Sequence, residues 1–421
     1  MPSSDVSRFT LYVSRLTFYA SRLWNHGAPA IKWALVIFAT MRFSLSLIAA
    51  MALFQFPLYH ATYYHGMEPV PPGIADYLLG VWQRFDTIWY IKIAMQGYAQ
   101  GDGSTVFFPL YPLLTRIVGI VLGGNHLLGG IVVSNVAYLL TLIVLYKLTQ
   151  LEFDSQVATR TVVYLSVFPT AFFLLGVYTE SLFLLFAAAA FCYARKGNWL
   201  GASVAGFLAA LTKQLGLLLL LPLLYEYLAQ NSKLETQNPM FRLVRRDILL
   251  LALIPLGTLA FLLYRHFYIG EPFLVESYRV QWAVNASWPW HNIWDSLMAI
   301  FDTERFPALN LEDTLARRIF YNSFDLACVG LFVFLTIVCF RRLRLGYGLY
   351  MVSVLFVTLM QNFRPPYPIV AMPRYVLVLF PGFMVLGAMV KSKALHWAIV
   401  YPSTLLLGLF TAMFATWRVV A

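Results

Sequence analysis

The amino-acid sequence predicts an all-α polytopic membrane protein, and three observations support this fold class. Hydrophobic residues make up 60% of the 421 residues, charged residues make up 12%, and the mean hydropathy is +0.70, which is typical of bilayer-embedded chains. The apolar residues gather in stretches long enough for a helix to cross a bilayer. The Lys and Arg residues lie in short runs between these stretches. A nucleic-acid binder would cluster them on one soluble face, so the net charge of +11 does not indicate nucleic acid as a partner.

The first element is a basic N-terminal segment, residues 1–32. Ser-Arg pairs recur every seven residues there, at Arg8, Arg15 and Arg22, with Phe, Leu and Tyr between them. This pattern predicts a basic amphipathic helix on the cytoplasmic leaflet. A low-complexity extension without a function fits the pattern equally well, and the sequence leaves both interpretations open. A single transmembrane domain, residues 33–421, follows.

Apolar spans of membrane length predict the transmembrane helices. The stretch 199–228 is too long for one helix, and Lys213 and Gln214 interrupt it. Basic residues flank this stretch at both ends, so both flanks are expected in the cytoplasm. We therefore predict a broken hairpin, with Lys213 at the turn near the outer side. The predicted spans are 33–55, 127–149, 157–177, 180–194, 199–212, 215–228, 247–268, 319–340, 345–361, 373–390 and 396–417.

The distribution of charge predicts the orientation. The segments assigned to the cytoplasm hold 17 of the 30 Lys and Arg residues and 6 acids, whereas the outer segments hold 12 bases and 13 acids. This asymmetry follows the positive-inside rule. It places the N-terminus inside, the C-terminus outside, and two large loops outside, residues 56–126 and 269–318.

Both outer loops carry recognisable elements. The first is predicted to hold two amphipathic helices that lie on the bilayer, 82–98 and 108–123, the latter opened by Pro109 and Pro112. The second carries four tryptophans, for which an interfacial aromatic layer is favoured over a sugar-stacking surface. These tryptophans are Trp282, Trp288, Trp290 and Trp294.

Four charged residues are predicted to converge on the outer face: Asp86, Glu180, Lys213 and Arg374. Charges at such depths are costly and usually face a cavity or one another. Two acids and two bases suit a reaction that removes a proton and stabilises a departing phosphate. Tyr90 lies one helical turn from Asp86, on the same face. Taken singly, each group has an alternative: Lys213 and Arg374 could snorkel to lipid headgroups, and Glu180 could cap a helix.

Other polar groups are interpreted as structural. The three cysteines lie in or beside apolar spans, so buried thiols are favoured over disulfides or a metal site. Glu152 and Asp154 fall in a cytoplasmic segment, which predicts a solvated loop.

The motifs around the four charges resemble the PIG-V-like mannosyltransferases, which include the second mannosyltransferase of GPI-anchor assembly and its prokaryotic relatives. The first-loop motif is Phe85-Asp86-x3-Tyr90-x2-Ile93-Ala94-x2-Gly97-Tyr98 with Phe107-Phe-Pro-Leu-Tyr-Pro112. The others, in the family's order, are Phe168-Pro-x-Ala-Phe-Phe173 with Tyr178-Thr-Glu-Ser-Leu-Phe183, Leu208-Ala-Ala-Leu-Thr-Lys213-x2-Gly216, Gln281-Trp282, and Pro373-Arg374-Tyr375 with Phe380-Pro381. They span residues 82–381. Phe85 stands where the family usually has Trp. Lys213 stands where it often has Arg, which keeps the charge but loses the bidentate fork.

This resemblance implies a GT-C glycosyltransferase fold and a prokaryotic plasma-membrane enzyme whose site faces away from the cytoplasm. It implies a polyprenyl- or dolichyl-phosphate sugar donor, most often mannose, and inversion at the anomeric carbon. The acceptor, whether a glycan, a lipid or a protein, is left open. Asp86 would be the general base, and Lys213 and Arg374 would neutralise the leaving phosphate.

The remaining site residues are assigned to substrate. Glu180 would orient the acceptor or hold a divalent cation, and the sequence leaves both roles open. The resemblance also implies substrate contacts for Tyr90, Gln281, Trp282 and Tyr375. No cofactor follows with certainty.

A rival interpretation from another class is a transporter or flippase for lipid-linked saccharides. It would share the number of spans and the basic cytoplasmic rim. Such proteins place charges at the bilayer midplane and show internal repeats, and the sequence has no such repeat.

Overall fold

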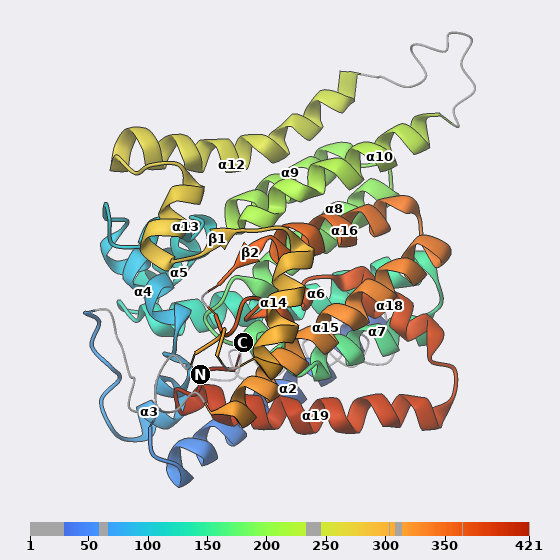
Figure 1. The fold of residues 1–421 in the computed structure, drawn as a ribbon. Helices are drawn as coiled ribbons and strands as arrows, with labels where there is room; N and C mark the ends of the chain where they lie inside the picture. Colours follow the sequence, from blue (N-terminus) through green and yellow to red (C-terminus); the bar gives the residue numbers. More distant parts are fainter. Residues whose placement is uncertain are drawn as a thin grey trace, which may run out of the picture.

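The computed structural model describes residues 29–58, 66–232, 246–302, 304–307, 314–363 and 365–420. Over this part of the chain it is an all-α polytopic membrane protein, with helices that run side by side in one bundle (Figure 1). Of the predicted N-terminal segment, residues 1–28 lie outside the described residues.

Five helices are long and apolar enough to cross a bilayer within the described residues. Each coincides with a predicted span. They are α2 (Pro29–Gln55), α6 (His126–Glu152), α15 (Leu315–Arg342), α19 (Lys393–Ala415) and a helix over Asp247–Ile269 made of η5 (Arg246–Ala252), α12 (Leu253–Leu263) and η6 (Tyr264–Ile269).

The other predicted spans contain shorter helices. These are α7 (Ser155–Val167), α8 (Glu180–Arg195), α9 (Trp199–Thr212), α10 (Leu220–Asn231), α16 (Leu345–Leu359) and α18 (Phe380–Met389). Helix is therefore confirmed in every predicted span, whereas the number of membrane crossings stays a prediction.

Two predicted spans are broken where the sequence has proline. The span 157–177 is α7 followed by a break at Pro169 and the short helix η3 (Ala171–Leu174). The span 373–390 is two helices, α17 (Met372–Val376) and α18, with Pro381 in the first turn of α18. Proline has no N–H to donate and clashes with the preceding turn, so each helix stops before it and restarts.

The predicted break at Lys213 is confirmed. Helix α9 ends at Thr212, Lys213 has extended backbone (φ −156°, ψ 146°), and η4 (Gln214–Leu219) leads into α10. Gly216 permits the return, since a Cβ there would lie 2.3 Å from the backbone of Ala209. The chain therefore doubles back against α9 with backbone packed on backbone.

The two large loops hold the predicted helices and a short sheet. The first loop contains α3 (Ile74–Leu78), η1 (Gly80–Trp82), α4 (Asp86–Gln96), η2 (Ser104–Val106) and α5 (Leu110–Val121). The second contains α13 (Leu274–Trp282), β1 (Asn285–Ala286) and α14 (Pro289–Phe301), and β1 pairs antiparallel with β2 (Gln361–Asn362). In Figure 1, α4, α5, α13 and the sheet lie at one end of the bundle, on the left, which we call the cavity end.

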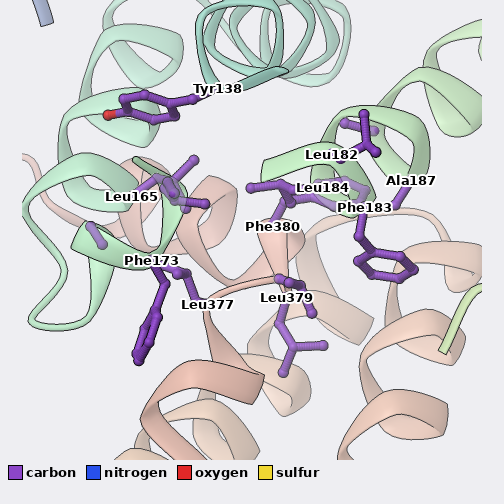
Figure 2. Close-up of a cluster of buried hydrophobic side chains, with 14 of the residues drawn as sticks. Tyr138, Leu165, Phe173, Leu182, Phe183, Leu184, Ala187, Leu377, Leu379 and Phe380 are labelled. Atoms are coloured by element: carbon purple, nitrogen blue, oxygen red, sulfur yellow. The ribbon is translucent and has the colours of Figure 1, made fainter. Parts of the chain in front are cut away.

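The core lies between α6, α7, α8 and the segment that precedes α18. Figure 2 shows Tyr138 of α6, Leu165 of α7 and Phe183 of α8 around Leu377 and Leu379, all of them buried. Because apolar side chains from four segments meet here, the start of α18 is anchored inside the bundle. This anchoring fixes α17 at the cavity end.

One expectation was wrong at the opposite end of the bundle. Glu152 does not belong to a solvated loop, because its side chain is 9% exposed and accepts hydrogen bonds from Arg195 and, at 2.9 Å, from the Tyr347 hydroxyl. Asp154 caps α7 by accepting from the backbone N–H groups of Gln156 and Val157. These partners come from other helices or the next turn, which a local charge pattern does not reveal. The three cysteines are buried and free.

Candidate active site

Four charged side chains form one continuous row at the cavity end. Arg374 stands between two carboxylates, with Nη1 2.5 Å from Asp86 Oδ2 and Nε 2.6 Å from Glu180 Oε1. Lys213 Nζ lies 2.9 Å from the same oxygen of Glu180. The order is Asp86, Arg374, Glu180, Lys213, and the signs of charge alternate. We call this set the charged row; it brings together the four residues that the sequence predicted to converge.

The local fold places Asp86 at the start of α4. Phe85, just before it, has a positive φ of 51°, a backbone conformation that L-residues rarely adopt. Arg84 holds this bend: it is 1% exposed and donates from Nε to the Ala415 carbonyl (2.9 Å) and from Nη1 to the Gly80 carbonyl (2.6 Å). A carboxylate in the first turn of a helix also faces the positive end of the helix dipole.

Arg374 is delivered by α17, which follows Ala371 with a positive φ of 73°. Its guanidinium carbon lies 4.6 Å from the ring centroid of Tyr178 and 5.1 Å from that of Phe173. Thr170 donates its hydroxyl to the Pro373 carbonyl at 2.8 Å. The guanidinium is thus stacked on aromatic faces while its edges bind the carboxylates.

Asp325 is a residue that the sequence analysis did not assign to the site. It is 4% exposed on α15 and accepts a hydrogen bond from the backbone N–H of Met372, the first residue of α17. One turn earlier, Asn322 donates to the Pro366 carbonyl at 3.0 Å. The sequence did contain the signal: a carboxylate inside an apolar helix is costly unless it has a role.

A cavity of about 300 Å³ opens beside the charged row, and we call it the active-site cavity. Asp86, Lys213 and Arg374 line it, together with the predicted aromatic residues. Trp282 donates its indole N–H to the Gly103 carbonyl at 3.0 Å, and the Tyr375 ring lies 5.4 Å from Lys213 Nζ.

Tyr90 also lines the active-site cavity, as expected from its spacing from Asp86. Its hydroxyl lies 3.4 Å from that of Thr179. Burial raises the pKa of Tyr90 well above its ordinary value, although nearby Arg374 opposes the shift. Tyr90 is therefore a neutral phenol at neutral pH, suited to hydrogen bonding rather than to taking up a proton.

Two predicted substrate contacts occupy other positions. Glu180 is 0% exposed and does not line the active-site cavity, because Lys213 and Arg374 cover it. Gln281 lies away from the charged row, 3.3 Å from a carboxylate oxygen of Glu271. Its neighbour Trp282 takes the position in the cavity wall.

Glu271 belongs to a buried network that joins the two large loops. It accepts from the Gly101 backbone N–H at 2.6 Å and from the Ser277 hydroxyl at 3.0 Å, and Arg265 donates to Ser277 at 2.8 Å. Gly101 belongs to the first loop, whereas Ser277 lies on α13 of the second. The network therefore holds α13, and with it Trp282, against the first loop.

The other three tryptophans of the second loop do not line the active-site cavity. Trp288, just before α14, and Trp290 and Trp294, on α14, are more than half exposed, and the rings of the first two stack with centroids 4.9 Å apart. Exposure of this kind fits an interfacial layer and a sugar-stacking surface alike, so the interfacial layer stays a prediction.

The donor set does not fit a divalent cation. Among the described residues, no group of three or more His, Cys, Asp or Glu side chains comes together. Glu180, for which the sequence left a metal-binding role open, already lies between Lys213 and Arg374, whose positive charges oppose a cation.

Comparison with known proteins gives matches to part of the chain and to its overall shape. The family model described as dolichyl-phosphate-mannose-protein mannosyltransferase matches residues 108–261, a range that contains Glu180 and Lys213 and excludes Asp86 and Arg374. No curated protein matches.

Similar solved structures include ArnT from Cupriavidus metallidurans bound to undecaprenyl phosphate, with TM-score 0.46 and 12% identity over 91% of this chain and 76% of that chain. They also include the Archaeoglobus fulgidus oligosaccharyltransferase AglB in complex with an inhibitory peptide and a dolichol-phosphate, with TM-score 0.44 and 11% identity over 90% of this chain. This chain spans 56% of the length of AglB.

Proposed function

We propose that this protein is a GT-C glycosyltransferase of the plasma membrane. It moves a sugar, mannose in our assignment, from a polyprenyl- or dolichyl-phosphate donor to an acceptor hydroxyl on the extracytoplasmic face. The observation that carries this proposal is the charged row beside the active-site cavity, with a carboxylate at one end and a lysine at the other. A base and a phosphate site are the two parts that such a transfer needs.

The donor phosphate is assigned to Lys213 and Arg374. Both cations line the active-site cavity, and their charge-assisted hydrogen bonds stabilise phosphate oxygens more as negative charge develops on them. The match to a dolichyl-phosphate-mannose transferase family supports this donor class and mannose as the sugar.

An apolar space for the prenyl chain adjoins this site. A cavity of about 390 Å³ lies between α4, α5 and α12 and is lined mainly by apolar side chains. Phe261 in its wall packs against Phe108 in the wall of the active-site cavity, with ring centroids 4.9 Å apart. A prenyl tail in this space would hold its phosphate near Lys213.

Asp86 is assigned as the general base. It takes the proton of the acceptor hydroxyl, whose oxygen forms a bond to the anomeric carbon. The bond from that carbon to the phosphate oxygen breaks, and the prenyl phosphate leaves with the electron pair from the opposite side. The anomeric configuration inverts, and one carboxylate suffices because phosphate departs without an acid.

Donor binding would also release the base. In the structure Arg374 holds one oxygen of Asp86. The donor phosphodiester in the active-site cavity carries one negative charge, as a carboxylate does, and presents two free oxygens, so it competes with Asp86 for this guanidinium. As Arg374 turns to the phosphate, Asp86 becomes available to the acceptor, which couples base activation to donor binding.

A purified transfer assay tests the proposal. Detergent-solubilised protein is incubated with prenyl-phosphate [³H]mannose and a membrane glycolipid extract, and released prenyl phosphate and labelled product are measured. We expect both, with a product whose anomeric configuration is opposite to that of the donor. If proteoliposomes move the donor across the bilayer and the sugar–phosphate bond stays intact, the protein is a flippase.

A further inference from the structure

A second cavity, of about 120 Å³, adjoins the charged row. Asp86, Arg374 and Val419 line both cavities. The other residues that line the second cavity are Phe85, Phe173, Tyr178, Phe414 and Val420. The ion pair of Asp86 and Arg374 therefore stands in the wall between an aromatic cavity and the larger active-site cavity.

The two cavities meet different ends of the charged row. The described residues that line the second cavity include Asp86 and Arg374 but neither Glu180 nor Lys213. Lys213, the cation farthest along the row from Asp86, lines the active-site cavity. Asp86, at one end of the charged row, thus lines both cavities, whereas Lys213, at the other end, lines the active-site cavity alone.

A displacement that inverts the anomeric carbon needs the base and the phosphate site at different ends of the charged row. The attacking oxygen and the leaving phosphate lie on opposite sides of the anomeric carbon, so the base must be separated from the far end of the phosphate site, which is Lys213. With the phosphate at Lys213, the space on the far side of Asp86 is available to the nucleophile.

We infer that the second cavity holds the reacting ring of the acceptor, a single neutral sugar or cyclitol ring that presents one hydroxyl to Asp86. This inference rests on the proposed function and adds the acceptor class to it. Aromatic rings pack against the C–H faces of such a ring. A space of about 120 Å³ admits the reacting edge of one such ring beside Asp86 and excludes an extended peptide.

The wall of the second cavity is held by contacts outside it. Phe85 packs against Trp417 with ring centroids 5.1 Å apart, and the Arg84 guanidinium lies 5.6 Å from the Trp417 ring centroid. The Tyr178 hydroxyl donates to the Arg84 carbonyl at 3.3 Å and is thus already engaged. With Arg374 assigned to the donor phosphate, Asp86 remains as the polar side chain for the ring among the described residues that line the second cavity, which favours an uncharged hydroxyl compound.

A matched pair of substitutions separates the two cavities. Val420 lines the second cavity and Val106 lines the active-site cavity; both are buried, at 4% and 6% exposure. Val420→Phe and Val106→Phe add the same volume to one cavity each. Val420→Ala, which enlarges the second cavity, is the companion variant in case the Phe variant unfolds.

The measurements use defined probes. Equilibrium binding of [³H]myo-inositol and methyl α-[³H]mannoside to purified protein reports on the ring site without turnover. Transfer from prenyl-phosphate mannose to the same compounds, and to a Ser/Thr-containing peptide, gives the KM of donor and acceptor separately.

We expect Val420→Phe to weaken ring binding and raise the acceptor KM roughly tenfold or more, because the added phenyl ring occupies the space that the acceptor ring needs, while the donor KM stays within about twofold. Val106→Phe should raise the donor KM and leave ring binding and the acceptor KM nearly unchanged.

A raised donor KM with Val420→Phe would place the donor sugar in the second cavity and overturn the inference. Peptide preference, or ring binding unaffected by Val420→Phe and Val420→Ala, would overturn it too. If the wild-type protein binds the ring compounds but shows no transfer, and Val420→Phe abolishes that binding, then the ring site is confirmed and the proposed function is wrong.

Discussion

Asp86 and Arg374 are 288 residues apart in the chain and form an ion pair of 2.5 Å in the wall of the active-site cavity. Each begins or belongs to a helix that follows a residue with positive φ, Phe85 at 51° and Ala371 at 73°. Such backbone costs of the order of 1–3 kcal/mol per residue and persists where the surroundings enforce it, as at functional sites. The fold therefore contains two unfavourable backbone conformations at the points where it brings these two charges together.

The first prediction concerns the base. Asp86→Asn keeps the shape of the side chain and removes its basicity, so turnover should fall by ~10²–10⁴-fold while donor binding and thermal stability survive. Asp86→Glu should also be poor, because one added methylene misplaces the carboxylate. The control is Asp295→Asn, which removes the half-buried partner of the exposed Arg305. Turnover of the Asp86→Asn variant within a few-fold of wild type would show that Asp86 is structural.

The second prediction concerns the cation end of the charged row. Lys213→Ala removes a charge-assisted contact to the donor phosphate and should raise the donor KM, by ~1.5–3 kcal/mol in binding free energy. Lys213→Arg should retain most of the affinity, because the guanidinium keeps the charge and adds a second donor. Lys92→Ala, which breaks the pair of Lys92 with Asp102 outside the cavity, is the control. An unchanged donor KM in Lys213→Ala would remove Lys213 from the phosphate site.

The third prediction tests Asp325 as a positioning residue. Asp325→Asn still offers an oxygen to the Met372 N–H, whereas Asp325→Leu does not. If this contact places α17, Leu should lower kcat by roughly 10²-fold through misplaced Arg374, with donor KM nearly unchanged, and Asn should rescue it. Thr336→Val, whose hydroxyl bonds within α15, is the control on the same helix. Equal loss of kcat in the Leu and Asn variants would contradict the positioning role.

The fourth prediction concerns acid. Partial burial tends to raise the pKa of Asp102, but hydrogen bonds with Ser104 and Lys92 outweigh it and hold the pKa below its ordinary 3.8. A lowered folded-state pKa stabilises the fold above the unfolded value, and this stabilisation is lost as pH falls through the folded value. The thermal midpoint of wild type should therefore drop more steeply below pH 3.8 than that of Asp102→Asn. Parallel curves for the two proteins would show that Asp102 contributes nothing to the acid sensitivity.

The fifth prediction concerns orientation. In a cysteine-free background, Ala99→Cys in the first loop should react with an impermeant thiol reagent in intact cells, and Ser232→Cys at the opposite end should react only after the cells are opened. Both positions are exposed, so access depends on the side of the membrane. The reverse labelling pattern would place the charged row in the cytoplasm and remove the extracytoplasmic donor.

Sequence alone determined where most of the helices lie, because each depends on local properties, although the spans 157–177 and 373–390 each proved to be two helices. Runs of apolar residues positioned α2, α6, α15 and α19, and the polar interruption at Lys213 positioned the break after α9. The positive-inside pattern assigned Asp86, Glu180, Lys213 and Arg374 to one end of the bundle, and the structure brings them together there.

The tertiary structure decided which atoms meet. It placed Arg374 between Asp86 and Glu180, buried Glu180 behind Lys213, and placed the Gln281 side chain beside Glu271 instead of the charged row. It also revealed the role of Asp325, whose partner lies on another helix. The physical reason is that hydropathy is a property of each segment alone, whereas these hydrogen bonds join segments far apart in sequence, and their distances exist only after the helices have packed.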